Sequence, residues 1–365
     1  MRNHWNETTE IVGRLTGLLA AGRGAALATV VAVEGSAYRR PGAKYLVDDR
    51  GETLGSVSGG CLEADVREVA AASIATGHCS WRRYDTGSST GEIAWGLGLG
   101  CDGRVDVFVQ PATAGALPDL LPRLAARLAG DRPFTLLTEL GEAPGRGDAR
   151  TGGLLLADDE GTHGALAGGG LDQAVVARLA PSDRSAVQHV AGRTFFCERM
   201  RPPEQLLVCG AGDDSIPLVE AAAGVGLRVL VVDHRPALAT PARFPRAHRL
   251  YVAAPDESGL DGLHAGEALA VVKMHDYDRD RAWVRRLLAA GAPFVGLLGP
   301  RARGAKIRAE IGAAESAPLH SPVGLVPGAE GAHQIAISVV AQLLDFLRRR
   351  EAHTVPVAVA TIDGS

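Results

Sequence analysis

The chain has 365 residues and a formal net charge of −4, from 38 Lys and Arg against 42 Asp and Glu. Its length predicts about two or three domains, and its near-neutral charge without a basic block argues against nucleic acid or an anionic membrane surface as a partner. The longest apolar run, Ala25 to Val33, is far too short to span a bilayer. The five cysteines contain no C-x-x-C pair, which argues against structural zinc and favours a reducing, cytoplasmic setting.

The first stretch of the chain has the pattern of a mixed α+β unit. Apolar residues at helical spacing predict a helix over Thr8–Ala21, and an apolar run predicts a buried strand over Ala25–Val33. Further strand patterns lie at Lys44–Asp48 and Glu52–Val57, a helix pattern at Cys61–Thr76, and two more strand patterns at Trp81–Tyr84 and Arg104–Gln110.

The same order of elements returns after a connecting helix over Leu117–Leu128. Strand patterns at Phe134–Glu139 and Gly153–Ala157 precede a glycine turn, a helix over Leu171–Leu179, and strands near Ala186 and at Arg193–Glu198. The segment LVDDRGETLGSVSGGCLEADV from Leu46 recurs as LLADDEGTHGALAGGGLDQAV from Leu155. We therefore predict an N-terminal α+β domain built from two repeated units, residues 1–113 and 114–202.

The two copies differ at Cys61, which is matched by Gly170 in the second copy. The preceding Ser58-Gly59-Gly60 permits a tight backbone turn, and N–H groups at the start of the expected helix would stabilise a thiolate. We interpret Ser58, Gly59, Gly60 and Cys61 as a candidate binding segment, with Cys61 as a nucleophile or a ligand for a soft metal. The alternative is a small buried cysteine at a helix–sheet contact.

The other cysteines have weaker signals. Cys101 lies in the glycine-rich run Gly98–Gly103 and either meets Cys61 in one pocket or serves the turn. Cys79, Cys197 and Cys209 lie in or beside strand patterns, so we expect them in the core. A short basic cluster precedes the first glycine turn and suits either an anionic ligand or a solvated loop: Arg39, Arg40 and Lys44, with Tyr38.

After Pro203 the pattern changes to strands that alternate with helices. An apolar strand at Gln205–Cys209 is followed by a helix over Ser215–Ala223 and a second strand at Leu227–Val232. Apolar strands at Ala268–Met274 and Pro293–Leu298 are each followed by a helix pattern, and Gln334–Arg350 predicts a closing helix. This alternation predicts a Rossmann-like, doubly wound parallel sheet over residues 203–350, with 351–365 as a flexible tail. The predicted fold class is therefore α/β.

The first strand of this second part is followed by a partial dinucleotide-binding motif. Gly210-x-Gly212-x-x-Ser215 follows the strand, and Asp233 ends the next one, where it would bind a ribose hydroxyl. Asp213 and Asp214 in the first helical turn argue against routine NAD binding, because they would repel a pyrophosphate. Structural use of the same turn is the alternative.

Two further candidates follow later strands of the same predicted sheet. His275 directly follows the strand that ends at Met274, and Gly299 and Arg301 follow the next strand. The carboxyl ends of the strands are where open α/β sheets place their ligands, and an arginine there suits phosphate. A capping histidine is the alternative for His275, and His320 has no evident purpose.

Several long motifs in order resemble the xanthine dehydrogenase accessory factor family (XdhC/CoxI). They run collinearly from about Leu27 to Leu347 and include GSAYRRPGAKYLV, GSVSGGCLEADV, GLGLGCDGRVDVFVQP, VVDHRPALATPARFP, MHDYDRD, FVGLLGPRAR and LHSPVGL. The family's Gly-Gly-Cys falls on Gly59, Gly60 and Cys61. Two departures are Asp102, which replaces a glycine, and Asp213-Asp214-Ser215, which stands where many members have His-Val-Ala.

The resemblance implies a maturation factor for molybdenum hydroxylases. Such a factor binds molybdenum cofactor, as molybdopterin or its cytidine dinucleotide form, protects it while the terminal sulfur is added, and inserts it into an apo-enzyme of the xanthine or carbon monoxide dehydrogenase type. It further implies a cysteine desulfurase as partner, a homodimer, and no turnover of its own. Cys61 would contact molybdenum, relay sulfur or shape the pocket.

Two other functions fit parts of the sequence. The glycine turn and Asp233 favour an NAD(P)-dependent oxidoreductase as the alternative function. A scaffold that only recruits partners is the third, but it gives no reason for a cysteine framed by glycines in one copy alone.

Overall fold

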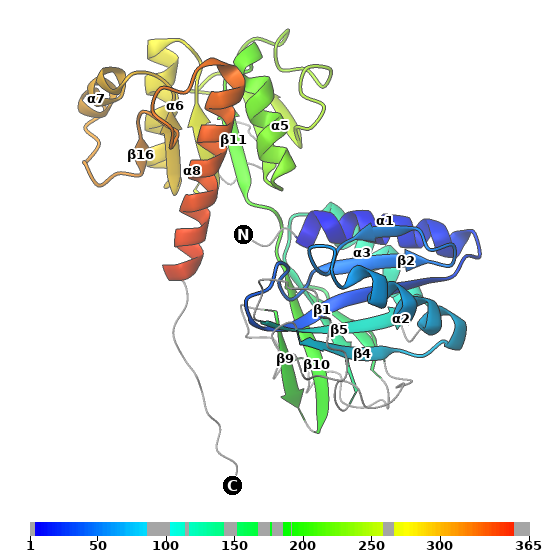
Figure 1. Ribbon diagram of the computed structural model, residues 1–365. Helices are drawn as coiled ribbons and strands as arrows, with labels where there is room; N and C mark the ends of the chain where they lie inside the picture. Colours follow the sequence, from blue (N-terminus) through cyan, green and yellow to red (C-terminus); the bar gives the residue numbers. More distant parts are fainter. Residues whose placement is uncertain are drawn as a thin grey trace. The chain divides into compact units, whose positions relative to one another are not determined.

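The computed structural model describes residues 4–85, 103–113, 117–141, 152–166, 176, 185–190, 192–257 and 266–353. The chain divides into two compact units, Arg2–Pro202 and Pro203–Ser365 (Figure 1). Antiparallel sheets form the first unit and a parallel sheet forms the second, which confirms the predicted α/β class with an N-terminal α+β part. No helix within the described ranges is long and apolar enough to cross a membrane.

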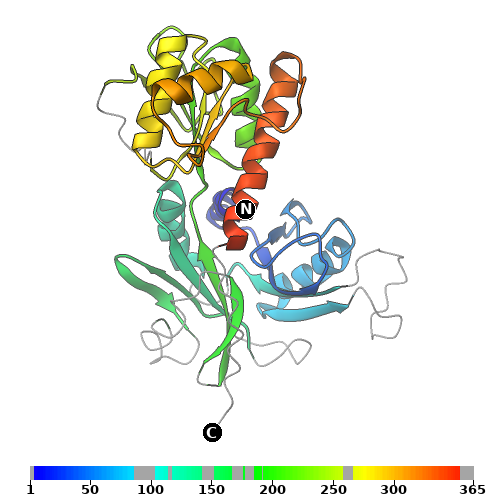
Figure 2. The same cartoon turned by 90° about the vertical axis from the view of Figure 1, so that its left-hand side faces the viewer.

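Two five-stranded antiparallel sheets form the described part of the first unit, and Figure 2 shows them as separate sheets. The first has the strand order β3-β2-β1-β5-β4, made of β1 (Ala25–Gly35), β2 (Lys44–Asp48), β3 (Thr53–Gly55), β4 (Ser80–Asp85) and β5 (Gly103–Pro111). The second has the order β8-β7-β6-β10-β9, made of β6 (Phe134–Glu139), β7 (Leu154–Asp158), β8 (Gly161–Ala165), β9 (Ala186–Val190) and β10 (Arg193–Met200). The second order repeats the first, which confirms the predicted duplication.

A pair of matching glycines shows that the two sheets also share local geometry. Gly55 and Gly164 both have positive φ, 85° and 103°. A Cβ atom on Gly55 would lie 2.3 Å from the Lys44 carbonyl oxygen, and one on Gly164 would lie 2.2 Å from that of Leu154. Only glycine fits such an approach of two strands, so both copies keep it.

In the part of the first unit that the structure describes, three helices cover the sheets. They are α1 (His4–Ala20), α2 (Glu63–Thr76) and α3 (Leu117–Ala129). Helices α1 and α3 pack together through Ile11, Leu15 and Leu121 in a shared apolar cluster. Helix α2 instead packs Val66 and Ala70 against the strands of the first sheet. Helix α2 ends at Gly77, whose left-handed φ of 73° closes the helix as the sequence predicts.

Strand β8 was not predicted from the sequence, where its residues were interpreted as a glycine turn. This strand, GTHGA, lies at the edge of its sheet and is largely exposed, so it carries no apolar alternation. The predicted helix over Leu171–Leu179 lies outside the described residues, except for Val176.

The second unit is built on a six-stranded parallel sheet in the order β13-β12-β11-β14-β15-β16. Its strands are β11 (Gln205–Cys209), β12 (Arg228–Asp233), β13 (Arg249–Val252), β14 (Leu269–Val272), β15 (Phe294–Leu297) and β16 (Leu319–His320). Counted from the first strand, this order is 3-2-1-4-5-6, the Rossmann arrangement. The order reverses between β11 and β14, and the crevice at such a point is where open α/β sheets bind ligands.

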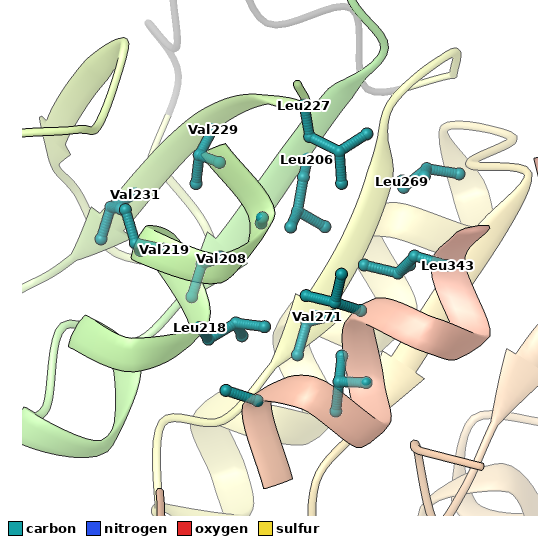
Figure 3. Close-up of a cluster of buried hydrophobic side chains, with 14 of the residues drawn as sticks. Leu206, Val208, Leu218, Val219, Leu227, Val229, Val231, Leu269, Val271 and Leu343 are labelled. Atoms are coloured by element: carbon teal, nitrogen blue, oxygen red, sulfur yellow. The ribbon is translucent and has the colours of Figure 1, made fainter. Parts of the chain in front are cut away.

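Helices lie on both faces of this sheet (Figures 1 and 2). A short 3₁₀ turn, η1 (Asp213–Ser215), leads into α5 (Ile216–Gly224), and α6 (Tyr277–Ala289), α7 (Arg301–Glu310) and α8 (Gly331–His353) follow. Alternate residues of β11 point to opposite faces: Leu206 and Val208 meet α5 and α8 (Figure 3), whereas Leu207 and Cys209 meet α6. The core of this unit is therefore two apolar layers, one on each face.

Two strands of this unit lack a sequence signal. β13 is a half-exposed edge strand and β16 has only two residues, so neither shows the apolar run that marks the central strands. The closing helix α8 spans Gly331–His353, so it is longer at both ends than the predicted Gln334–Arg350.

Candidate functional site

The segment around Cys61 is a hydrogen-bonded turn that precedes helix α2. The helix begins at Glu63 with Leu62 as its N-cap, so the prediction that Cys61 opens the helix is wrong. Gly60, with φ of 110°, turns the chain just before the cysteine. The thiol therefore lies on a turn, not on the first helical turn.

Glu63 and Ser58 hold this turn together. The Glu63 carboxylate accepts hydrogen bonds from the Ser58 N–H at 2.8 Å, from the Val57 N–H at 3.2 Å and from the Ser58 hydroxyl. The Ser58 hydroxyl oxygen in turn accepts from the amides of Gly60 and Leu62, both at 3.1 Å, on either side of Cys61. Burial would raise the pKa of Glu63, but these hydrogen bonds lower it, so the group is ionised.

This network changes the role expected for the amides of the turn. Four of their N–H groups already donate to Ser58 or Glu63, so the chain supplies its own negative charge where a bound anion was expected. The turn thus positions the thiol more than it offers free amides.

Cys61 differs from the other cysteines of the described residues in its exposure. Cys61 is half-buried, whereas Cys79, Cys197 and Cys209 are fully buried in the core, as predicted. Burial raises the pKa of Cys79 to about 12 and that of Cys197 to about 11, so both stay protonated thiols. Cys61 is thus the described thiol that a solute can reach. Cys101 lies outside the described residues.

Tyr38 lies beside the thiol turn. Its side chain is 77% exposed, and its ring lies 3.6 Å from the position of a Cβ atom on Gly59. Ala37 and Cys61 border the same apolar cluster. The loop before β2 and the turn before α2 therefore form one surface, which we call the thiol surface: Ala37, Tyr38, Ser58, Gly59, Gly60 and Cys61.

The basic cluster near Tyr38 is mostly engaged in ion pairs. Arg39 pairs with Glu7, and the buried Lys44 pairs with the buried Glu198 of β10. Lys44 and Glu198 also line a cavity of about 40 Å³ inside the first unit, which exceeds the roughly 10–15 Å³ that a single water molecule needs. Arg40 is exposed, so it is the cation of this cluster best placed for an anionic solute.

The thiol surface carries several of the differences between the two copies. Gly42 of the first copy corresponds to Gly152 of the second, and both have positive φ. At the same spacing in the sequence, Tyr38 is matched by Asp148. Ser58 and Cys61 are matched by Ala167 and Gly170. The aromatic ring, the hydroxyl and the thiol of this surface are therefore all peculiar to the first copy.

In the second unit, the glycine turn lies at the reversal point of the sheet. Gly210 has φ of 118°, and a Cβ atom there would lie 2.5 Å from the Lys273 carbonyl oxygen. The Ser215 hydroxyl, fully buried, donates to the Gly210 carbonyl at 2.7 Å. Gly210 is thus required by the close approach of two chain segments, which supports the structural alternative for this glycine.

Asp233 is fully buried and its carboxylate is fully engaged. Oδ2 accepts from the Ala211 N–H at 2.7 Å and from Arg235 Nη2 at 2.9 Å, while Oδ1 accepts from the N–H and the Nε of Arg235, both at 2.9 Å. Four donors occupy the lone pairs of the two oxygens. Asp233 can therefore bind a ribose hydroxyl only if Arg235 moves away.

The two acidic residues of the first turn are neutralised by partners that the sequence pattern did not indicate. Arg243 Nη2 lies 2.7 Å from Asp213 Oδ1. Asp214 Oδ2 lies 2.9 Å from the Nζ of buried Lys273 and 2.8 Å from His275 Nε2. Burial would raise the pKa of Asp214, but its bonds to Lys273 and His275 lower it, so the carboxylate is ionised.

His275 has an unusual backbone for this position. Its φ is 57°, and no other non-glycine residue in the described part of the chain has positive φ. Its side chain is 62% exposed, and its contact with Asp214 links the end of β14 to the glycine turn after β11. The structure therefore brings the predicted residues Gly210, Gly212 and His275 together with Asp214 and Lys273, which we call the crevice cluster.

Gly299 and Arg301 lie at the neighbouring strand end. Gly299 has φ of 132°, and Arg301 is the exposed first residue of α7. It is Arg303 that pairs with the buried Asp280, whose Oδ1 accepts from the Met274 N–H at 2.9 Å. His320 stacks on Phe294 with ring centroids 4.1 Å apart, which explains it as a core contact. Among the described residues, no group of three metal-binding side chains could hold an ion.

Comparison with known proteins gives matches along most of the chain. Residues 206–343 match the XdhC Rossmann domain, and residues 18–85 match the XdhC and CoxI family. A protein of Bacillus subtilis (strain 168), whose name describes a probable subunit of xanthine dehydrogenase, is 32% identical over 335 residues, which cover 89% of this chain and 94% of the relative.

Two further proteins are similar over nearly the full length. One, from Escherichia coli (strain K12), is named "Molybdenum cofactor insertion chaperone PaoD" and is 24% identical over 91% of this chain and 86% of its own. The other is a crystal structure described as a xanthine dehydrogenase from Bacillus halodurans, with a TM-score of 0.79, 27% identity and coverage of 98% of both chains. The fold is thus shared with a solved structure over nearly the full length of the chain.

Proposed function

The chain belongs to the XdhC and CoxI family, and we propose that it is a carrier for molybdenum cofactor in the maturation of a molybdenum hydroxylase of the xanthine dehydrogenase type. It binds the cofactor, protects it, supports the addition of its terminal sulfur and delivers it to the apo-enzyme. The chain needs no turnover of its own for this role. A relative of similar length is named a molybdenum cofactor insertion chaperone, which supports the proposal.

The observation that carries the proposal is the thiol surface. The half-buried Cys61 lies on a turn fixed by Ser58 and Glu63, next to an exposed tyrosine. A soft sulfur ligand suits molybdenum and its sulfur atoms, and a fixed turn lowers the ordering cost of binding. Because the second copy has the sheet but lacks these residues, the fold alone does not require them.

Within the second unit taken by itself, the crevice cluster is a proposed place for a phosphate group, such as that of molybdopterin or of its cytidine dinucleotide form. Gly210, Gly212 and His275 lie at the reversal point of the sheet, and Gly299 and Arg301 lie at the next strand end. An exposed arginine at a helix start suits a phosphate. Asp233 supports this binding indirectly, since it anchors the Ala211 amide of the turn.

The alternative of an NAD(P)-dependent oxidoreductase loses its main support. The Asp233 carboxylate, which would hold the ribose hydroxyl of a dinucleotide, is occupied by Arg235 and by the Ala211 amide. Calorimetry with NADH and NADPH tests this alternative; tight binding of either would favour it over the carrier.

The partners proposed for the carrier are those that the family resemblance implies. We include in the proposal a cysteine desulfurase as the sulfur donor, a homodimer as the assembly, and the cytoplasm as the compartment, since a reduced thiol is required. Co-purification with each partner tests them separately.

Replacement of Cys61 tests the proposed function. We expect Cys61→Ala to weaken binding of molybdenum cofactor at least tenfold, measured by fluorescence of the oxidised pterin that co-purifies, and to reduce the activation of apo-hydroxylase in parallel. Arg67→Ala, an exposed change on the neighbouring helix α2, is the control and should alter neither. Binding and activation by the Cys61→Ala protein equal to those of the control would refute the role of the thiol.

A further inference from the structure

Lys273 is a buried cation at the reversal point of the parallel sheet. It directly follows β14, its side chain is 3% exposed, and its backbone carbonyl is in close contact with Gly210 of the turn after β11. Asp214 is the anion that the described residues provide for it. A buried ammonium without a counter-charge would be costly, so some anion must occupy this place.

Asp214 supplies that anion from an unusual position. Its Oδ2 atom is shared between Lys273 Nζ at 2.9 Å and His275 Nε2 at 2.8 Å. Its Oδ1 atom would lie 2.8 Å from a Cβ atom on Gly212, so the carboxylate lies over the second glycine of the turn. In dinucleotide-binding folds, the absence of a side chain at this glycine lets a pyrophosphate approach the helix start.

We propose that the Asp214 carboxylate is an internal stand-in for a phosphate group, and that Lys273 and His275 form an anion subsite that a phosphorylated ligand fills when Asp214 swings out. The exchange breaks and forms only hydrogen bonds and ion pairs. The ligand class is a phosphate or pyrophosphate ester. The anion subsite deepens the proposed function. Only the identity of its natural ligand rests on that function.

Three observations favour an exchangeable carboxylate over a purely structural ion pair. The Asp214 side chain is 32% exposed, so it can leave without opening the core. His275 is held at positive φ in the position that lets its ring reach Asp214, and strain of this kind gathers at ligand-binding sites. Gly212 has no side chain to obstruct the moving carboxylate.

Titration calorimetry with inorganic pyrophosphate on the full-length chain tests the proposal. Asp214→Asn removes the competing charge and frees Lys273 and His275, so we expect pyrophosphate to bind at least tenfold more tightly than to the wild-type chain. Asp213→Asn is the matched control: it removes the same charge one residue earlier but frees Arg243 instead of Lys273. We expect it to change the affinity less than threefold.

The double variant Asp214→Asn/Lys273→Met should lose the gain, because the cation is absent. Equal affinities of the Asp214→Asn and Asp213→Asn proteins would overturn the proposal, since the effect would then be one of net charge alone. So would a gain that survives in the double variant.

A second measurement does not depend on the folding of the Asp214→Asn protein. In the wild-type chain, saturating pyrophosphate should shift the ring resonances of His275, identified by their loss in His275→Gln, as its bond to Asp214 breaks. Unshifted resonances at saturation would also overturn the proposal. Neither measurement involves molybdenum cofactor, so failure here leaves the carrier function standing, and failure of Cys61→Ala to impair the carrier leaves this subsite standing.

Discussion

Replacement of Asp233 by asparagine gives the most quantitative test of the crevice geometry. The carboxylate is fully buried and accepts four hydrogen bonds, three from Arg235 and one from the Ala211 N–H. Asparagine keeps the shape of the side chain but loses the charge and one acceptor oxygen. The change therefore removes the ion pair with Arg235 and leaves the fold of β12 in place.

The expected magnitude follows from the pKa of the carboxyl group. Burial alone would raise the pKa of Asp233, but hydrogen bonds from Arg235 and Ala211 bring it down from 3.8 to about 2. A folded-state pKa below the unfolded value stabilises the native state above pH 3.8, and the contribution is lost as the pH falls through 2. The difference corresponds to about 2 kcal/mol at neutral pH, of which about 1 kcal/mol remains at pH 3.

Hydrogen exchange of the β11 and β12 amides measures this contribution in the full-length chain. We expect Asp233→Asn to lower the free energy of opening by about 2 kcal/mol at pH 6 and by about 1 kcal/mol at pH 3. The decrease between the two pH values is the diagnostic result, because other groups titrate equally in both proteins. If the free energies of opening of the wild-type chain and the variant differ by the same amount at both pH values, the ion-pair geometry is refuted.

Two further predictions concern the first unit. Glu63→Gln leaves donors of the thiol turn unsatisfied, so alkylation of Cys61 by iodoacetamide, measured by mass spectrometry, should become about fivefold or more faster. Glu68→Gln, an exposed change on the same helix, should leave the rate unchanged. Equal rates in the two variants would show that Glu63 does not hold the turn. Gly55→Ala should lower the free energy of unfolding in urea by about 3 kcal/mol or more, because the new Cβ atom would overlap the Lys44 carbonyl oxygen. Gly51→Ala, at a similar φ but in open space, should lower it by only about 1 kcal/mol. Similar losses of stability in the two variants would mean that backbone conformation alone requires glycine at position 55.

The elements with strong apolar patterns were predictable from the sequence. Strand β2 spans the predicted Lys44–Asp48, and β11 spans the predicted Gln205–Cys209, because buried strands need continuous apolar residues. Edge strands β8 and β13 were missed, since half of each faces solvent and the pattern there is polar. Periodicity reports burial, so it fails where a strand is not buried.

The site was only partly predictable, because its partners are far apart in the sequence. The sequence indicated the acidic pair Asp213 and Asp214 but placed no cation near them, whereas the fold brings Arg243 and Lys273 to them. A lone lysine at the end of an apolar strand, in Val271-Val272-Lys273-Met274, was the available signal for a buried charge. For the thiol turn, the glycines indicated its position, but the role of Glu63 in holding it required coordinates.

In the proposed carrier, residues peculiar to the first copy and gathered around Cys61 bind the cargo. The most direct test is a titration of molybdenum cofactor onto the wild-type chain and onto Ser58→Ala/Cys61→Gly, which gives the first turn the residues of the second copy. We expect the variant to fold and to bind inorganic pyrophosphate like the wild type, but to bind the cofactor at least tenfold more weakly. Cofactor binding that is unchanged in the variant would show that these residues do not hold the cofactor.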